Sequence, residues 1–150
     1  MGLLKNPAQS FALVAGAVLL AAGILALGAG STNFGTVADG AGQDLLIWQV
    51  SGWETIFYLV VGTLGLMAAS RVGSARLFAL VSGYSFVALA VYGFVDGNDI
   101  LSVFAVAAAD KVTYLVIGLA GLMVGAISQA RKQLDEAQAP TRGPSHTSQA

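Results

Sequence analysis

The sequence predicts an all-α integral membrane protein with four transmembrane helices, arranged as two tandem two-helix repeats. Hydrophobic residues make up 56% of the 150 residues and charged residues only 10%, against roughly 25% charged residues in soluble domains. The apolar residues cluster in four runs near the length of about 20 residues that a spanning helix needs. The alternating segments of a membrane β-barrel are absent. The expected helices cover residues 9–28, 53–70, 76–95 and 110–130.

Besides the composition and the apolar runs, an internal repeat predicts this fold. Residues 54–67 and 110–123 align without gaps, and seven of the fourteen positions are identical. The segment Phe11-Ala-Leu-Val-x-Gly16 at the start of the first run recurs as Phe78-Ala-Leu-Val-x-Gly83 at the start of the third. Each repeat crosses the membrane twice, so the two copies have the same orientation. A pseudo-twofold axis along the membrane normal is the expected relation between them.

These observations define the expected domain organisation. A four-helix transmembrane domain covers residues 1–134, with repeats at about 8–70 and 75–130. The remaining residues, 135–150, are predicted to form a disordered cytoplasmic tail, because they are rich in Pro, Ser, Thr, Gln and Gly.

The first two helices have recognisable start signals. Pro7 and Ser10 precede the first apolar run, as is common at a helix entry. A cleaved signal peptide is the competing interpretation, but this run is longer than the usual 7–15 residues of such a peptide. Ser51 and Glu54 have the spacing of a capping box, which predicts that the second helix begins just after Ser51.

The connections differ in length. Residues 70–76 form a short turn, which makes the second and third helices antiparallel neighbours. Residues 44–50 and 100–109, in the two outer loops, are too short to span and too apolar for free loops. They are predicted to be interfacial segments, with Trp48 and Trp53 at headgroup depth.

The charges are divided between the two sides of the membrane. Basic residues gather on the side of the termini and the central turn, and acidic residues dominate the outer loops. The positive-inside rule therefore predicts cytoplasmic N- and C-termini. The same cations are candidates for contact with anionic lipid headgroups. They are Arg71, Arg76, Arg131 and Lys132.

The candidate functional or packing residues occupy matching faces of the second and fourth helices. Small residues at helical spacing let membrane helices approach closely, so these faces should be packed. The second helix contributes Glu54, Tyr58, Gly62 and Gly65, and the fourth contributes Asp110, Tyr114, Gly118, Gly121 and Gly125.

Two interpretations of the acidic residues remain open. Glu54 and Asp110 are placed at the outer membrane interface, where a carboxylate at a helix start is favoured by the helix dipole. The structural interpretation stops there, with Tyr58 and Tyr114 as aromatic-belt residues. The functional interpretation makes the acids and tyrosines a symmetric pair at the mouth of a cleft, where they bind a cation or carry protons.

The sequence contains no candidate residues for most kinds of catalytic chemistry. The chain has no cysteine, and its one histidine, His146, lies in the predicted tail without a fixed partner. No phosphate-binding loop, nucleophile motif or metal-ligand cluster is present. We therefore expect no enzyme activity, no catalytic residue, no cofactor, no metal site and no nucleic-acid partner.

Three short motifs resemble an uncharacterised bacterial membrane protein family, domain of unknown function 4383. They are Asn6-Pro-Ala-Gln-x-x-Ala-Leu-Val-x-Gly16, Gly52-Trp-Glu-x-x-x-Tyr-Leu-x-x-Gly62 and Ala109-Asp-Lys-x-x-Tyr-Leu-x-x-Gly118. The resemblance covers about residues 6–130 and implies a four-helix fold in a bacterial cell membrane. Members of that family often have His at the positions of Tyr58 and Tyr114, so a ligand role that depends on histidine does not carry over.

The expected function follows from these features. The first hypothesis is a non-enzymatic structural or accessory subunit that packs laterally with itself or with a larger membrane protein complex. Its partners would be the lipid bilayer and other transmembrane helices. The alternative is a small ion, proton or solute transporter that uses the Glu54/Tyr58 and Asp110/Tyr114 pair.

Overall fold

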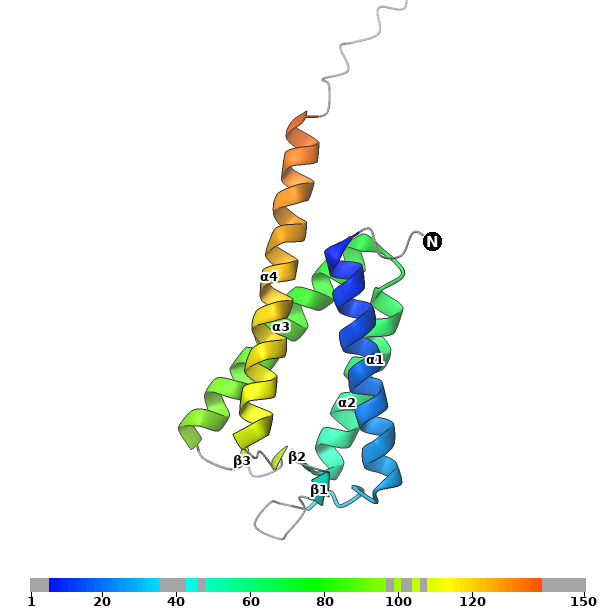
Figure 1. Ribbon diagram of the computed structural model, residues 1–150, viewed down its shortest axis with the longest axis vertical. Helices are drawn as coiled ribbons and strands as arrows, with labels where there is room; N and C mark the ends of the chain where they lie inside the picture. Colours follow the sequence, from blue (N-terminus) through cyan, green and yellow to red (C-terminus); the bar gives the residue numbers. More distant parts are fainter. Residues whose placement is uncertain are drawn as a thin grey trace, which may run out of the picture.

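The structure is a computed structural model that describes residues 6–35, 43–45, 48–96, 99–100, 104–105 and 108–138. Four helices form its body: α1 (Pro7–Gly28), α2 (Gly52–Ala68), α3 (Val72–Asp96) and α4 (Ala108–Gln138). The start of α1, the α2–α3 connection and the C-terminal part of α4 lie at one end, which we call the basic end (Figure 1). The short strands lie at the other end, which we call the loop end (Figure 1).

The helix-start signals of Pro7 and Ser51 are confirmed, whereas Ser10, which was expected to cap the first helix, lies inside α1. Asn6 caps α1, with its Oδ1 accepting from the Ala8 backbone N–H at 3.0 Å, and Pro7 occupies the first helical position. Ser51 caps α2, and its Oγ accepts from the Glu54 backbone N–H at 3.3 Å. The Glu54 carboxylate accepts in turn from the Ser51 backbone N–H at 2.9 Å. The capping box predicted for this helix is therefore present.

The fourth helix is longer than expected. It continues to Gln138, so residues 135–138 are helical, contrary to the predicted disorder from residue 135. The segment after Ala130 consists mainly of good helix formers. An ion pair between Lys132 and Glu136, 3.4 Å apart and four residues apart in sequence, also favours the helix. Residues 139–150, with His146, lie outside the described residues.

The four helices confirm the predicted all-α fold class, and the outer loops between them contain short β-ladders. Strand β1 (Gln43–Leu45) pairs antiparallel with β2 (Trp48–Val50), and β3 (Asp99–Ile100) pairs antiparallel with β4 (Phe104–Ala105). Pairing of the strands gives their backbone N–H and C=O groups hydrogen-bond partners, as the hydrogen bonds within a helix would. The side chain of Trp48 lies outside the described residues.

Trp53, the other tryptophan expected at headgroup depth, is 44% exposed at the loop end. Its Nε1 donates to the Phe34 carbonyl at 3.0 Å, and its ring meets the Phe34 ring edge-on at a centroid distance of 5.5 Å. These contacts hold the segment after α1 against the first turn of α2.

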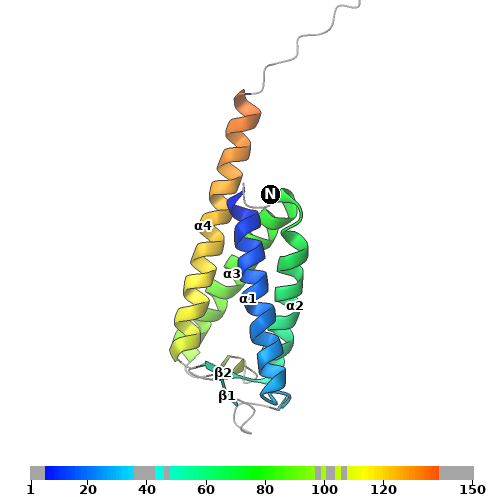
Figure 2. The ribbon, with the colours of Figure 1, turned by 45° about the vertical axis from the view of Figure 1, so that its right-hand side comes forward.

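The helices pack closely in two pairs, α1 with α2 and α3 with α4, and glycines make this proximity possible (Figure 2). A Cβ atom added to Gly16 would lie 2.7 Å from the Leu66 backbone nitrogen. In the second pair, a Cβ added to Gly83 would lie 2.8 Å from the Leu122 backbone nitrogen. Both distances are too short for a real Cβ atom, so the backbones themselves are in contact.

Helix length and composition give the chain the character of a membrane protein. Within the described residues, α1, α3 and α4 are long and apolar enough to cross a membrane, and α2 is a shorter apolar helix of 17 residues. Large apolar side chains cover the outer faces of the helices; Leu25, for example, is 64% exposed and Met123 64% exposed. Such a surface suits lipid rather than water.

Candidate functional site

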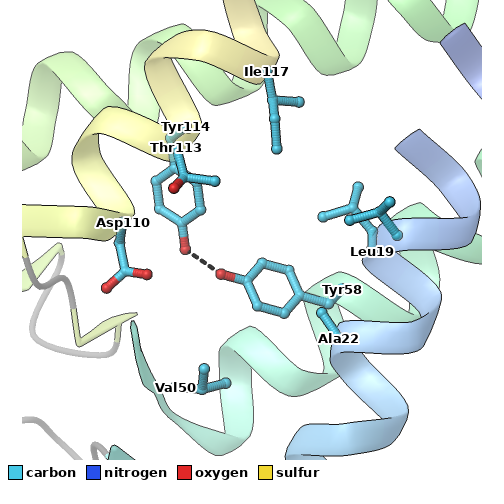
Figure 3. A pocket seen from close by; sticks show the side chains of 9 residues that line it. Leu19, Ala22, Val50, Tyr58, Asp110, Thr113, Tyr114 and Ile117 are labelled. Carbon is cyan, nitrogen blue, oxygen red and sulfur yellow. Dashed lines mark hydrogen bonds between the residues drawn. The ribbon is translucent and has the colours of Figure 1, made fainter. Parts of the chain in front are cut away.

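Two tyrosines from different helix pairs meet inside the bundle near the loop end (Figure 3). Tyr58 comes from α2 and Tyr114 from α4, and their side chains are 6% and 3% exposed. Phe86 of α3 packs against Tyr114 with a ring-centroid distance of 5.6 Å, and Phe57 packs edge-on against Phe86 at 5.8 Å. The tyrosines are therefore part of the core and not of an aromatic belt at the surface.

The tyrosine hydroxyls and Glu54 form a hydrogen-bond chain. The Tyr114 hydroxyl donates to Glu54 Oε1 at 2.9 Å, and the oxygens of the two tyrosine hydroxyls are 2.6 Å apart. A tyrosine hydroxyl has one proton. Since Tyr114 gives its proton to Glu54, the proton between the two hydroxyls belongs to Tyr58. The chain thus runs from Tyr58 to Tyr114 to Glu54.

Both carboxylate oxygens of Glu54 accept hydrogen bonds. Oε1 accepts from Tyr114, and Oε2 accepts from the Ser51 backbone N–H. The side chain is fully buried, with 0% of its surface exposed. Glu54 therefore caps its own helix, as the structural interpretation expects, and also joins α2 to α4.

Asp110 is also fully buried, with 0% of its surface exposed. It lies in the first turn of α4, on the same side of the tyrosine pair as the hydroxyl groups (Figure 3). Both acids lie in the first turns of their helices at the loop end, and their side chains are buried inside the bundle.

A cavity of about 130 Å³ adjoins the tyrosine pair. Its polar groups come from Asp110, Thr113 and the tyrosines, and its remaining walls are apolar side chains of α1, α4 and the end of β2 (Figure 3). The volume is close to that of engineered apolar cavities that hold one small molecule. The site therefore has space for a water molecule or a small ligand beside the buried Asp110 carboxyl group and the tyrosine pair.

The sequence analysis missed further polar residues around Glu54. The Thr55 hydroxyl donates to the Ser31 carbonyl at 3.2 Å and to the Ser51 carbonyl at 3.0 Å. Ser31 is 1% exposed, and its Oγ has no hydrogen-bond partner among the described residues. Thr55 adjoins Glu54 in sequence, but no pattern indicates that Ser31 returns from the end of α1 to meet it.

The glycines of the two faces continue from this site toward the basic end. All five are buried and lie against neighbouring helices, Gly62 and Gly65 against α1 and Gly118, Gly121 and Gly125 against α3. The four basic residues lie at the basic end, away from the tyrosines. Arg76, Arg131 and Lys132 line a common crevice there, whereas Arg71 lines a separate recess.

No group of three or more potential metal-ligating side chains occurs within the described residues. The polar groups that meet at the site are two carboxyl groups and two phenols. Such groups hold protons, water or a small cation, and they cross-link helices by hydrogen bonds.

Comparison with known protein families places residues 9–127 in the family described as Domain of unknown function (DUF4383), and the chain belongs to this family. The match covers all four helices, from the first turn of α1 to the apolar part of α4. Searches of curated proteins and of solved structures found no match.

Proposed function

We propose that the chain is a non-enzymatic membrane protein that acts as a structural or accessory subunit, by packing its outer faces against another transmembrane helix. The observation that carries this proposal is a groove between α2 and α3, lined by Ser82 and Ser85, in which Ser85 is exposed at the depth of the apolar helices. Hydroxyl-bearing and other small residues are enriched where membrane helices meet.

The groove has a volume of about 110 Å³. Phe57 and Phe86 lie in its wall, and Ser82 and Ser85 line it on the α3 side. The Ser85 hydroxyl donates to the Val81 carbonyl at 2.9 Å, which satisfies it, yet the residue remains exposed. Ser85 is small and its hydroxyl already has a hydrogen-bond partner. Next to the rings of Phe57 and Phe86, it permits close approach of a partner helix, as the glycines do inside the bundle.

A photocross-linking experiment tests this proposal. The chain has no cysteine, so Ser85→Cys creates a unique attachment point for a thiol-reactive benzophenone. In native membranes we expect this variant to form a protein adduct with a second copy or with one membrane protein that co-purifies in mild detergent. Leu119→Cys, which is exposed on α4, is the control and should form no such adduct. Equal labelling at both positions, or none, would contradict the proposal.

The proposed membrane arrangement has four spans in two tandem repeats, in a bacterial cell membrane. Helix α2 has 17 residues, which gives about 25 Å at 1.5 Å per residue and meets the lower limit of about 17 residues for a span. The matching glycine contacts of Gly16 and Gly83 support the repeat. The cations of the basic end support cytoplasmic termini.

A second candidate function is proton or cation transfer at the buried acid pair. The observation that favours it is the complete burial of two carboxyl groups, one of which, that of Glu54, is joined to the tyrosine chain. A proton added to Glu54 Oε1 would reverse the chain, so that Glu54 donates to Tyr114 and Tyr114 donates to Tyr58. However, the walls beyond Tyr58 toward the basic end are apolar side chains and glycines, such as Leu19 and Gly62, so the chain stops there.

Flux measurements distinguish this candidate. In liposomes with an internal pH dye, a transporter of this kind would carry protons, and the double variant Glu54→Gln, Asp110→Asn would abolish the flux. Flux that persists in the double variant would exclude the acid pair as the pathway. The Tyr84→Phe variant, on the exposed face of α3, is the control for a tyrosine outside the chain.

A further inference from the structure

We propose that the bundle holds one anionic phospholipid at its basic end, with the lipid phosphate in the crevice between α3 and α4 and an acyl chain along a groove between α1 and α4. This site is separate from the acid pair and from the α2–α3 groove, and it goes beyond the proposed function. Three features carry the proposal: the charge of the crevice, the apolar lining of the groove and the continuity of the two.

The crevice is a recess of about 490 Å³. Arg76 of α3 and Arg131 and Lys132 of α4 line it, with Asp135 as the one acidic residue. Because Lys132 also pairs with Glu136, the two arginines leave an excess of one positive charge over Asp135. A monoanionic phosphate group matches this excess.

The arginines of the crevice are available for a ligand. Within the described ranges the one ion pair is Lys132–Glu136, so neither Arg76 nor Arg131 is paired with a carboxylate there. Arg76 is half-buried, whereas Arg131 is exposed. The guanidinium group binds phosphate in a bidentate manner and is more weakly hydrated than ammonium, which makes arginine the preferred residue for such sites.

The groove between α1 and α4 is larger, with a volume of about 630 Å³. Its lining is almost entirely apolar and includes Phe11, Val14 and Val18 of α1 and Val116, Ala120 and Val124 of α4. The groove is open on one side and lies at the depth of the apolar helix segments. Its shape and lining suit a hydrocarbon chain.

The crevice and the groove share the same faces of two helices. On α4, Val124 lines the groove, and Ser128 and Arg131, four and seven residues later, line the crevice. Such spacing keeps residues on one helix face. At the start of α1, Pro7 lines the groove and the N-cap residue Asn6 lines the crevice. The Ser128 hydroxyl donates to Asn6 Oδ1 at 3.3 Å. A charged head and an apolar chain can therefore be accommodated in one molecule.

The length of the combined site also fits a membrane lipid. From Arg131 to Val116, α4 advances about 22 Å at 1.5 Å per residue. One leaflet contributes about half of the roughly 30 Å hydrocarbon core. The groove therefore extends over the depth of one leaflet, with the arginines at its headgroup side. Free phosphate would use the crevice but would leave the groove without a role.

Lipid binding to the purified full-length protein tests the proposal. The protein is exchanged into lipid-free detergent and titrated with palmitoyl-oleoyl phosphatidylglycerol or phosphatidylcholine, and bound lipid is counted by native mass spectrometry. We expect one retained phosphatidylglycerol and weaker retention of phosphatidylcholine. The double variant Arg76→Gln, Arg131→Gln should weaken phosphatidylglycerol binding by at least about tenfold, because the charge-assisted hydrogen bonds from the two guanidinium groups to the phosphate are lost.

Matched controls separate this site from general surface charge. Arg71→Gln removes one cation from the same end but outside the crevice, and it should leave phosphatidylglycerol binding unchanged. Arg76→Lys, Arg131→Lys keeps the charge and loses the bidentate fork, so the expected loss is smaller than with glutamine. If the glutamine variant does not fold, as judged by circular dichroism, the lysine variant and the groove variants carry the test.

Groove variants and soluble phosphate distinguish the two sources of a phosphate group. Ala120→Phe fills the groove and should displace the lipid, whereas Ala126→Phe, on an exposed position of α4, should not. Inorganic phosphate at millimolar concentration should not replace the lipid. If phosphate competes fully and Ala120→Phe has no effect, the ligand is a soluble phosphate and the lipid assignment is wrong. Equal binding of both lipids, insensitive to Arg76 and Arg131, would also overturn it.

Discussion

Replacing Tyr114 with phenylalanine is expected to destabilise the bundle by roughly 2–6 kcal/mol, because two buried polar groups each lose a hydrogen-bond partner, at a cost of about 1–3 kcal/mol per group. Its hydroxyl donates to Glu54 Oε1 and contacts the hydroxyl of Tyr58. The variant leaves the ring in place, so the packing against Phe86 is retained. The loss in unfolding free energy, measured by titration with a denaturing detergent, reports the hydrogen bonds alone.

Tyr58→Phe is the matched comparison. Tyr58 is at the end of the chain, and Tyr114 can still donate to Glu54 without it, so the expected cost is smaller, about 1 kcal/mol. The double variant should cost little more than Tyr114→Phe, since the bond between the hydroxyls is lost only once. Equal costs for the two single variants, or strictly additive costs, would mean that the chain does not run through Tyr114.

Gly62→Ala is the second change with a large expected effect. The new Cβ would meet the backbone of Leu20 and lie 2.9 Å from the Gly16 carbonyl oxygen. Backbone cannot move aside as a side chain can, so α1 must shift away from α2. Overpacking of this kind costs about 1–3 kcal/mol. Thermal unfolding in a mild detergent measures the loss.

Two other glycines provide a graded control for this substitution. At Gly125 the new Cβ would meet the end of the Leu80 side chain, which can rotate, so a smaller loss is expected. At Gly73 no atom lies within 4 Å, and alanine should be neutral or slightly stabilising because it favours the helix. A loss at Gly73 as large as that at Gly62 would show that helix proximity is not the cause.

Local signals predicted the helices well, because each depends on residues close together in sequence. The capping box of Ser51 and Glu54 needs only a spacing of three residues, and it is present. The end of α4 was misjudged because the composition of residues 131–138 is polar, and polarity alone does not distinguish a solvated helix from a disordered tail. The Lys132–Glu136 pair was the available signal.

The candidate site depends on contacts that no local pattern contains. Helical spacing predicted that Tyr58 and Tyr114 face inward, and the internal repeat showed that they occupy equivalent positions. Neither the spacing nor the repeat predicts that their hydroxyl oxygens lie 2.6 Å apart. The burial of Glu54 and Asp110 was missed for a related reason. A carboxylate at a helix start is normally solvated, and its burial here depends on residues from other elements, such as Val50 at the end of β2.

The bond between Tyr114 and Glu54 also has a consequence for the order of assembly during synthesis. The two residues are 60 positions apart in the chain, so Glu54 leaves the ribosome well before its partner. Before α4 is inserted, the Glu54 carboxylate can already accept the capping-box hydrogen bond from Ser51, but it cannot yet accept the hydrogen bond from Tyr114. The α1–α2 hairpin can close through its own glycine contacts. The insertion of the last helix is therefore the step that completes the interior of the first hairpin.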